Sequence, residues 1–163
     1  MRNKWILAAI AALVMSLGLG AQTLPVIKLT DAAGKNVSTQ TMIDGKTPFM
    51  VTFWASWCKP CQKELAALTE MAPDWDGDFP LRIYAVSVDD SRGLSRAKSM
   101  AAAGGWPATV LYDTKQEMMR TLDIVSIPHV IIYDKDGKQV YYHVGYIPGN
   151  EEEILQKLKE AAK

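Results

Sequence analysis

Cysteine is scarce in this sequence: its 163 residues include only two, Cys58 and Cys61. Two cysteines cannot form a disulfide-rich scaffold or a four-thiolate zinc site. An excess of charge of one sign is also missing, because 18 basic residues balance 18 acidic ones. This balance argues against nucleic acid as a partner, since proteins that bind it usually carry a basic excess. With 48% hydrophobic residues, the chain can bury the core of one globular domain.

A hydrophobic run long enough to span a membrane is missing as well. The apolar stretch from Trp5 to Leu19 has about 15 residues, whereas a spanning helix needs roughly 20. Basic residues precede it and small residues, ending with Ala21, follow, which is the order of a secretory signal. We therefore predict a signal peptide over residues 1–21 and an exported domain over residues 22–163, in the periplasm or another extracytoplasmic space. If the signal is not cleaved, it would tether the domain to the membrane.

The rest of the sequence alternates between strand-like and helix-like segments. Strands are predicted at short β-branched or aromatic runs, and helices where apolar residues recur every three or four positions. Asn150 and Glu153 form a capping-box pattern at the start of the last helix. This order predicts one α/β sandwich with a mixed sheet. The predicted strands are 24–29, 49–54, 81–88, 109–112, 129–133 and 139–144, the predicted helices are 60–72, 91–103, 115–122 and one from 150, and 30–48 is a polar connection.

The two cysteines lie at the junction between a buried strand and a helix. The segment WCKPC places Cys58 at the helix N-terminus and Cys61 one turn inside it, close enough for a disulfide. The helix dipole and Lys59 favour a thiolate at Cys58, and Pro60 suits the first helical turn. We predict that Cys58 is the exposed nucleophile with a lowered pKa and that Cys61 is the buried resolving thiol, which breaks the mixed disulfide. Lys59 and Pro60 would tune this chemistry.

A CxxC pair can also be half of a zinc site. The only histidines are His129 and His143, and their predicted strands do not bring them to the start of the helix. We therefore expect neither a metal nor another cofactor. A copper-binding metallochaperone remains an alternative, although no third ligand lies close to the pair in the sequence. A peroxidase would place its reactive cysteine in a different local motif.

The segment FWASWCKPC resembles the active site of the thioredoxin superfamily, and Ile127-Pro128 resembles its cis-proline loop. The exported N-terminus, the leading strand and the βα unit inserted after the CxxC helix resemble the TlpA/ResA-type branch, over roughly residues 24–160. The resemblance implies a thioredoxin-like three-layer α/β/α sandwich with a mixed central sheet and an N-terminal strand extension. It also implies that Pro128 packs against the disulfide and that Ile127 offers a backbone edge to a substrate chain. Trp57 is interpreted as a packing and shielding residue and is a further candidate for substrate contact.

The sequence departs from the family pattern at three positions. Thioredoxin has a buried aspartate where this chain has Thr52, and a hydroxyl cannot accept the proton of Cys61. The TlpA/ResA-type branch has an acidic residue after the next strand, so Asp90 becomes the candidate proton shuttle and Asp89 the second candidate. Both could equally be solvated loop residues. His129 replaces the threonine that usually follows the cis-proline, and we favour an ordinary strand residue over a titrating group at the site.

The resemblance implies an extracytoplasmic thiol-disulfide oxidoreductase, and favours a disulfide reductase over a disulfide-introducing oxidase. Reduction outside the cytoplasm requires a thiol reductase in the membrane as electron donor. The expected substrates are exported proteins with thiols or disulfides, apocytochrome c among them, and the domain is expected to be a monomer. Nothing in the sequence selects one substrate or fixes the direction of electron flow.

Overall fold

The computed structural model describes residues 22–163. The predicted signal segment therefore lies outside the described residues. Among the residues that are described, no helix combines the length and the hydrophobicity that crossing a membrane requires.

The strands of this domain form one seven-stranded sheet in the order β2-β1-β5-β4-β3-β6-β7. Its centre is β3, a strand in which all six residues are buried. Strands β4 and β5 run parallel to β3, whereas β6 and β7 form an antiparallel hairpin on its other side. The strands are β1 (Lys28–Thr30), β2 (Asn36–Ser38), β3 (Phe49–Trp54), β4 (Ile83–Ser87), β5 (Thr109–Tyr112), β6 (His129–Tyr133) and β7 (Gln139–Val144).

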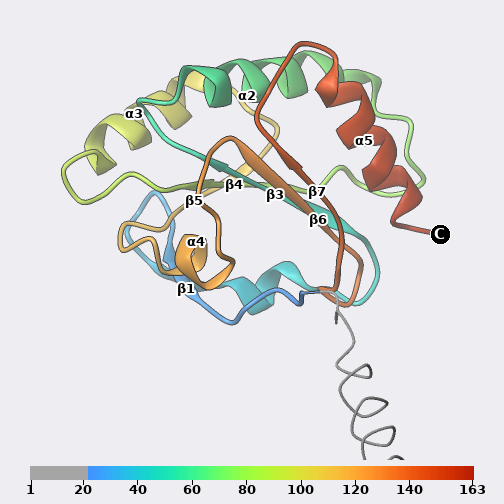
Figure 1. Ribbon diagram of the computed structural model, residues 1–163, viewed down its shortest axis with the longest axis horizontal. Coiled ribbons are helices and arrows are strands. Elements are labelled where there is room, and N and C mark those ends of the chain that lie inside the picture. The colour runs from blue at the N-terminus through green and yellow to red at the C-terminus, as the bar shows by residue number, and fades with distance from the viewer. Residues whose placement is uncertain (1–21) are drawn as a thin grey trace, which may run out of the picture.

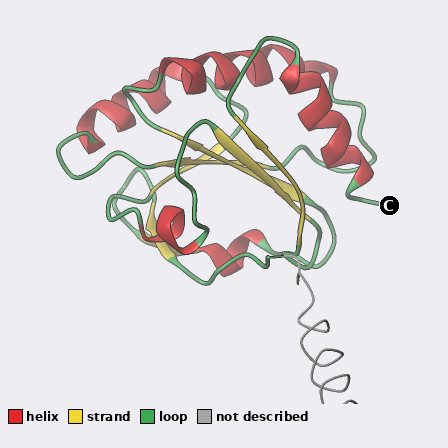
Figure 2. Ribbon diagram, viewed as in Figure 1, coloured by secondary structure: helices red, strands yellow, loops and turns green. Residues whose placement is uncertain are grey.

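Helices cover both faces of this sheet, which gives the three layers that the resemblance implied. Figure 1 shows α2, α3 and α5 above the sheet, with α4 and the short helix η1 below it. The same sandwich is visible in Figure 2, where the yellow strands lie between two layers of red helices. The helices are α2 (Lys59–Met71), α3 (Leu94–Gly104), α4 (Glu117–Thr121) and α5 (Asn150–Glu160), with short 3-10 turns at η1 (Thr39–Met42) and η2 (Ala72–Asp74).

The N-terminal region differs from its prediction. The leading strand covers only Lys28–Thr30, and the supposed polar connection contains β2 and η1. Thr39 is fully buried there. Its hydroxyl tolerates burial because it accepts a hydrogen bond from the Ile27 N–H and donates one to the Pro25 carbonyl. Residues 22–24 instead pair with the turn between β6 and β7, through a bridge between Thr23 and Lys138. A buried threonine with both bonds satisfied does not stand out in a polar sequence.

The predicted capping box at the last helix is wrong. Gly149, with φ +102°, occupies the cap position, and Asn150 is already inside α5. The Asn150 side-chain amide lies 2.6 Å from His143 Nε2, and the Glu153 carboxylate accepts a bond from the Tyr141 hydroxyl. Both polar side chains therefore tie α5 to β7 and leave the helix end to the glycine.

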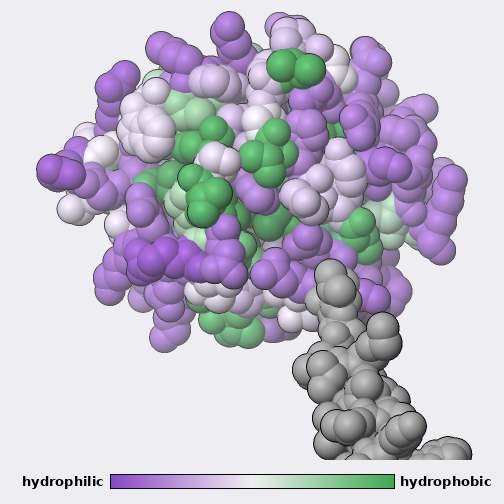
Figure 3. Space-filling model, viewed as in Figure 1, coloured by the Kyte–Doolittle hydropathy of each residue, from purple (hydrophilic) through white to green (hydrophobic). Residues whose placement is uncertain are grey.

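Strand β7 is the edge of the sheet and alternates between half-buried and exposed residues. Its exposed side chains include Val140, Tyr142 and Val144, which alternate with Tyr141 and His143, the residues that bond to α5. Figure 3 shows hydrophobic side chains in the middle of the face seen in Figure 1, with hydrophilic ones around them. Because alternate residues of a strand share one face, Val140, Tyr142 and Val144 form a row along the exposed side of β7.

Candidate active site

The cysteine pair lies where the central strand β3 passes into helix α2. Cys58 and Cys61 form a disulfide with their Cα atoms 5.3 Å apart. Cys58 caps the helix, since its sulfur accepts a bond from the Cys61 N–H at 3.3 Å, while Lys59 and Pro60 are the first two helical residues. The predicted position of both cysteines at the start of the helix is confirmed.

Exposure differs between the two cysteines in the predicted order, but both values are small. Cys58 keeps 5% of its surface exposed and Cys61 keeps none. Cys58 is therefore much less open in this disulfide form than the sequence suggested, because it packs within the apolar core cluster. The exposed neighbour is Trp57, at 63%. Of the two cysteines, only Cys58 retains exposed surface, and the exposed ring of Trp57 is its neighbour in the sequence.

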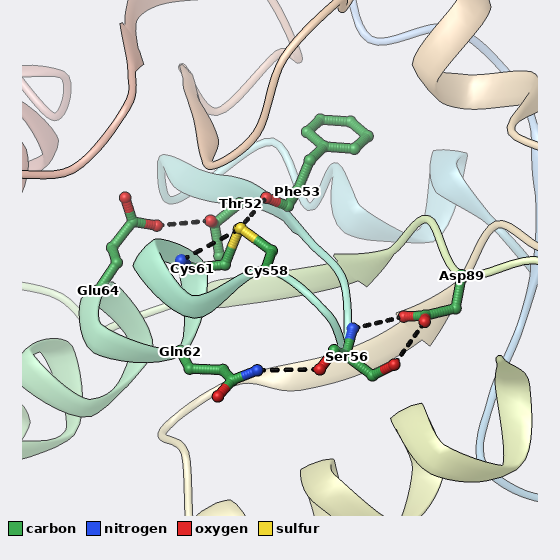
Figure 4. The surroundings of a disulfide bond; sticks show 8 residues. All are labelled: Thr52, Phe53, Ser56, Cys58, Cys61, Gln62, Glu64 and Asp89. Carbon is green, nitrogen blue, oxygen red and sulfur yellow. Dashed lines mark hydrogen bonds between the residues drawn. A yellow bond between two sulfur atoms is a disulfide. The ribbon is translucent and has the colours of Figure 1, made fainter.

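Two polar side chains hold the loop before the cysteines in place. Asp89, at the end of β4, accepts bonds from the Ser56 N–H at 2.8 Å and the Ser56 hydroxyl at 2.7 Å. A third bond comes from the Ser87 hydroxyl at 2.9 Å. On the other side, the Gln62 amide donates to the Ser56 carbonyl at 3.0 Å (Figure 4). Asp89, the second candidate proton shuttle, is thus buried and bonded to the loop, and within residues 22–163 no hydrogen bond joins it to either sulfur.

Glu64 is the buried acid that the sequence reasoning missed. It is fully buried one helical turn after Cys61, and its carboxylate accepts a 2.7 Å bond from the Thr52 hydroxyl (Figure 4). The second carboxylate oxygen has no hydrogen-bond partner among the described residues. Burial raises the pKa of Glu64 to about 7, the Thr52 bond opposes this increase, and the charge of Glu151 adds to it. The site therefore contains a carboxyl group that can gain or lose a proton near neutral pH.

A signal for Glu64 was present in the sequence. Positions three apart on a helix share a face, so Glu64 follows Cys61 onto the side that also holds Leu65 and Leu68. A charged residue on the apolar face of a helix is a candidate for a buried titrating group. Thr52, which replaces the aspartate of thioredoxin, is the residue that binds it.

Asp90, the first candidate proton shuttle, lies in a different environment. Its side chain is 43% exposed and forms a 2.7 Å ion pair with Arg92. It also accepts bonds from the backbone N–H groups of Arg92 and Gly93, ahead of helix α3. The Arg92 bond lowers the pKa of Asp90. Within residues 22–163, no hydrogen bond connects Asp90 to Cys61.

The proline loop lies on the other side of β3. The Ile127–Pro128 peptide bond is cis, and Pro128 is buried. The Gly145 N–H donates to the Pro128 carbonyl at 2.8 Å, which connects this loop to the end of β7. Ile127 makes no backbone hydrogen bond to the described residues. Its peptide group is therefore available to another chain.

His129 begins β6 and pairs with Phe53 of β3. Its ring stacks on Tyr142 and meets Phe53 edge-on. Burial lowers the pKa of His129, and the charge of His143 lowers it further. This aromatic packing supports the favoured interpretation of His129 as a strand residue. Among residues 22–163, no group of three or more histidine, cysteine or acidic side chains is arranged to hold a metal ion.

A redox cysteine pair on the first turn of α2, with a cis-proline loop across β3, is the arrangement of a thioredoxin-like thiol-disulfide oxidoreductase. The chain belongs to the AhpC/TSA family, whose family model matches residues 21–142.

Individual relatives agree with this assignment. The thiol-disulfide oxidoreductase ResA of Bacillus thuringiensis (strain Al Hakam) is 30% identical over 121 residues, which are 74% of this chain and 67% of the relative. An uncharacterized thioredoxin-like protein from Porphyromonas gingivalis superposes with a TM-score of 0.72 at 37% identity, covering 89% of this chain and 94% of its own. A putative thiol:disulfide interchange protein DsbE from Chlorobium tepidum gives 0.72 at 25% identity, with coverages of 88% and 98%. The chain is a thiol-disulfide oxidoreductase of the ResA/DsbE type.

Proposed function

We propose that this protein is a disulfide reductase that acts on exported proteins outside the cytoplasm, and that Glu64 is the proton acceptor for Cys61. The observation that carries the proton-acceptor role is the position of Glu64, which is buried, bonded to Thr52 and one helical turn from the resolving cysteine. The direction and the location are proposed from the family resemblance and the predicted signal. A carboxyl group with a pKa of about 7 can take the proton of a thiol and later return it.

The proposed reaction starts from the dithiol form. The Cys58 thiolate attacks one sulfur of a substrate disulfide, which forms a mixed disulfide and releases the first substrate thiolate. Cys61 then gives its proton to Glu64 and, as a thiolate, attacks the Cys58 sulfur. This step releases the second substrate thiolate and forms the Cys58–Cys61 disulfide. Two electrons and two protons from a donor dithiol then restore the starting form.

Substrates are proposed to bind between Trp57 and the proline loop. Trp57 exposes most of its ring beside Cys58, while Val125 and Ile147, on the two loops joined by the bond between Gly145 and Pro128, expose apolar side chains. The free peptide group of Ile127 can pair with an extended substrate segment in the manner of a strand. On the basis of the family resemblance, apocytochrome c is a candidate substrate. The candidate electron donor is a thiol reductase in the membrane.

Reduction of insulin disulfides with dithiothreitol as the electron source tests the main proposal. We expect catalysis by the wild type, none by Cys58→Ser, and accumulation of mixed disulfides by Cys61→Ser. Asp90→Asn is the matched comparison for Glu64→Gln, because both remove one negative charge. Glu64→Gln should slow resolution of the mixed disulfide by about 100-fold and remove a pH step near 7, whereas Asp90→Asn should keep that step. A pH step lost in Asp90→Asn and kept in Glu64→Gln would return the shuttle role to Asp90.

The redox potential of the cysteine pair tests the direction. A redox potential of about −270 mV is expected for a reductase, and one of about −120 mV would identify the oxidase instead. Export is tested by the mass of the protein recovered from cells, since cleavage after Ala21 leaves residues 22–163. Recovery of a full-length cytoplasmic protein would overturn the proposed location.

A further inference from the structure

A cavity lies beside the loop that precedes Cys58, on the β4 side of β3. It has a volume of about 550 Å3 and is lined by Ser56 and Trp57, by the segment that follows β4, by Arg92 ahead of α3, and by Arg96 in the first turn of α3. Strand β4 pairs with one side of β3 and β6 pairs with the other. A polypeptide joined to Cys58 could therefore extend across the proline loop in one direction and into this cavity in the other.

The charged residues that line the cavity are two acids and two arginines, and not all of them are paired. Asp89 is buried and holds the Ser56 loop, and Asp90 is already paired with Arg92. Arg96 is exposed, and no hydrogen bond or ion pair joins it to another residue of the described domain. Among the four charged residues that line the cavity, Arg96 is thus the one whose charge has no hydrogen-bond or ion-pair partner within residues 22–163.

Arg96 also lines a neighbouring groove of about 470 Å3 between α2 and α3, together with Met100 and Trp106. Both the groove and the cavity are lined by this arginine, which lies in the first turn of α3. A guanidinium in a cleft offers a carboxylate two parallel hydrogen bonds, which an isolated lysine cannot do.

We infer that this cavity selects substrates with an acidic side chain near the reactive cysteine, which Arg96 binds. The inference rests on the proposed reductase function and names its preferred substrate class. Because the arginine is exposed to water, the expected selectivity is that of a surface ion pair, about two- to fivefold in rate. Such a preference must weaken as salt screens the charges.

The test uses peptide disulfides that differ only in having Glu, Gln or Lys two residues from the cysteine, on either side of it. The reduced full-length protein is mixed with each peptide, and the second-order rate constant of reduction is measured. On the favoured side, the wild type should reduce the Glu peptide about two- to fivefold faster than the Lys peptide. Arg96→Gln should bring this ratio to one, and Arg96→Glu should reverse it. Asp90→Asn, which leaves Arg92 without its partner, should raise the ratio.

Lys46→Gln is the matched control, because it removes one positive charge from an exposed residue that precedes β3, at the opposite end of that strand. It should leave the ratio unchanged. Uncharged hydroxyethyl disulfide separates the two proposals, since Arg96→Gln and the wild type should reduce it at equal rates. Reduction of all disulfides with a Glu-to-Lys ratio of one, or a ratio that survives in Arg96→Gln, would overturn the inference alone. Failure to reduce any disulfide would overturn the proposed function and the inference with it.

Discussion

At the scale of the residue, the Glu64 carboxyl group is separated from water and retains a single hydrogen bond, from Thr52. Its pKa rises from 4.5 to about 7 in the folded protein. The folded state therefore binds a proton that the unfolded state releases as the pH rises from 4.5 to 7, so the free energy of unfolding must fall over this range. Above pH 7 Glu64 is ionised in both the folded and the unfolded state, and the decrease in the free energy of unfolding reaches its full value.

Glu64→Gln should remove this pH dependence. Gln has nearly the same shape and can still accept the Thr52 bond, but it carries no charge to desolvate. We expect the variant to be more stable than the wild type at pH 8, by up to about 3 kcal/mol, with a difference that shrinks towards pH 4.5. Denaturant titrations of the disulfide form at both pH values measure the difference. An equal gap at pH 4.5 and pH 8 would show that ionisation of Glu64 is not its cause.

The roles of single residues could be predicted only in part from the sequence. The positions of Cys58 and Cys61 follow from their spacing and from the strand before them. The environment of Glu64 depends on Thr52, which lies twelve positions earlier and meets it only when β3 and α2 pack together. Asp89 and Asp90 are adjacent in the sequence, yet one is buried and the other exposed. No local pattern distinguishes them.

At the scale of the element, the loop before the cysteines depends on Asp89. Asp89→Ala removes three hydrogen bonds and leaves the N–H and the hydroxyl of Ser56 buried without a partner, while the Ser87 hydroxyl keeps only the bond that it accepts from the backbone N–H of residue 89. We expect a loss of about 2 to 4 kcal/mol in the free energy of unfolding, together with slower attack by Cys58. Asp90→Ala is the control, because its exposed carboxylate bonds only to Arg92 and to the backbone of the turn ahead of α3, so the loss should be much smaller. Denaturant titration of both variants gives the comparison, and equal losses would contradict the role assigned to Asp89.

The start of α5 depends on the backbone of Gly149. Its φ of +102° is one that side chains rarely adopt, and a Cβ placed there would meet no atom within 4 Å. Gly149→Ala should therefore destabilise the protein by about 1 kcal/mol through backbone strain alone. Thermal unfolding measures this loss. A variant as stable as the wild type would mean that the loop after β7 adopts another conformation without penalty.

Most elements could be predicted from periodicity, because the central strands and the long helices have strong apolar patterns. The prediction was wrong where tertiary contacts decide the structure. Strand β2 has three residues and pairs only with β1, so it has too few positions to show a pattern. At α5, the side chains that resembled a capping box bind β7 instead.

At the scale of the whole molecule, the redox state of one cysteine pair should change the stability of the entire domain. An efficient oxidant is more stable with its pair reduced, and a reductase has the opposite preference. We therefore expect the disulfide form to unfold at a higher guanidinium concentration than the dithiol form, in titrations with and without reductant. A more stable dithiol form would contradict the reductase proposal and support the oxidase.

The pairing of residues 22–24 with the turn after β6 places the start of the described domain at the end of β3 where Phe49 lies opposite Tyr133. The disulfide follows the other end of that strand, six residues and roughly 20 Å away. A group attached before Gln22 is therefore joined to the domain on the side opposite its redox centre. A membrane anchor or an affinity matrix attached there would leave Cys58 facing outward, free to meet its partners.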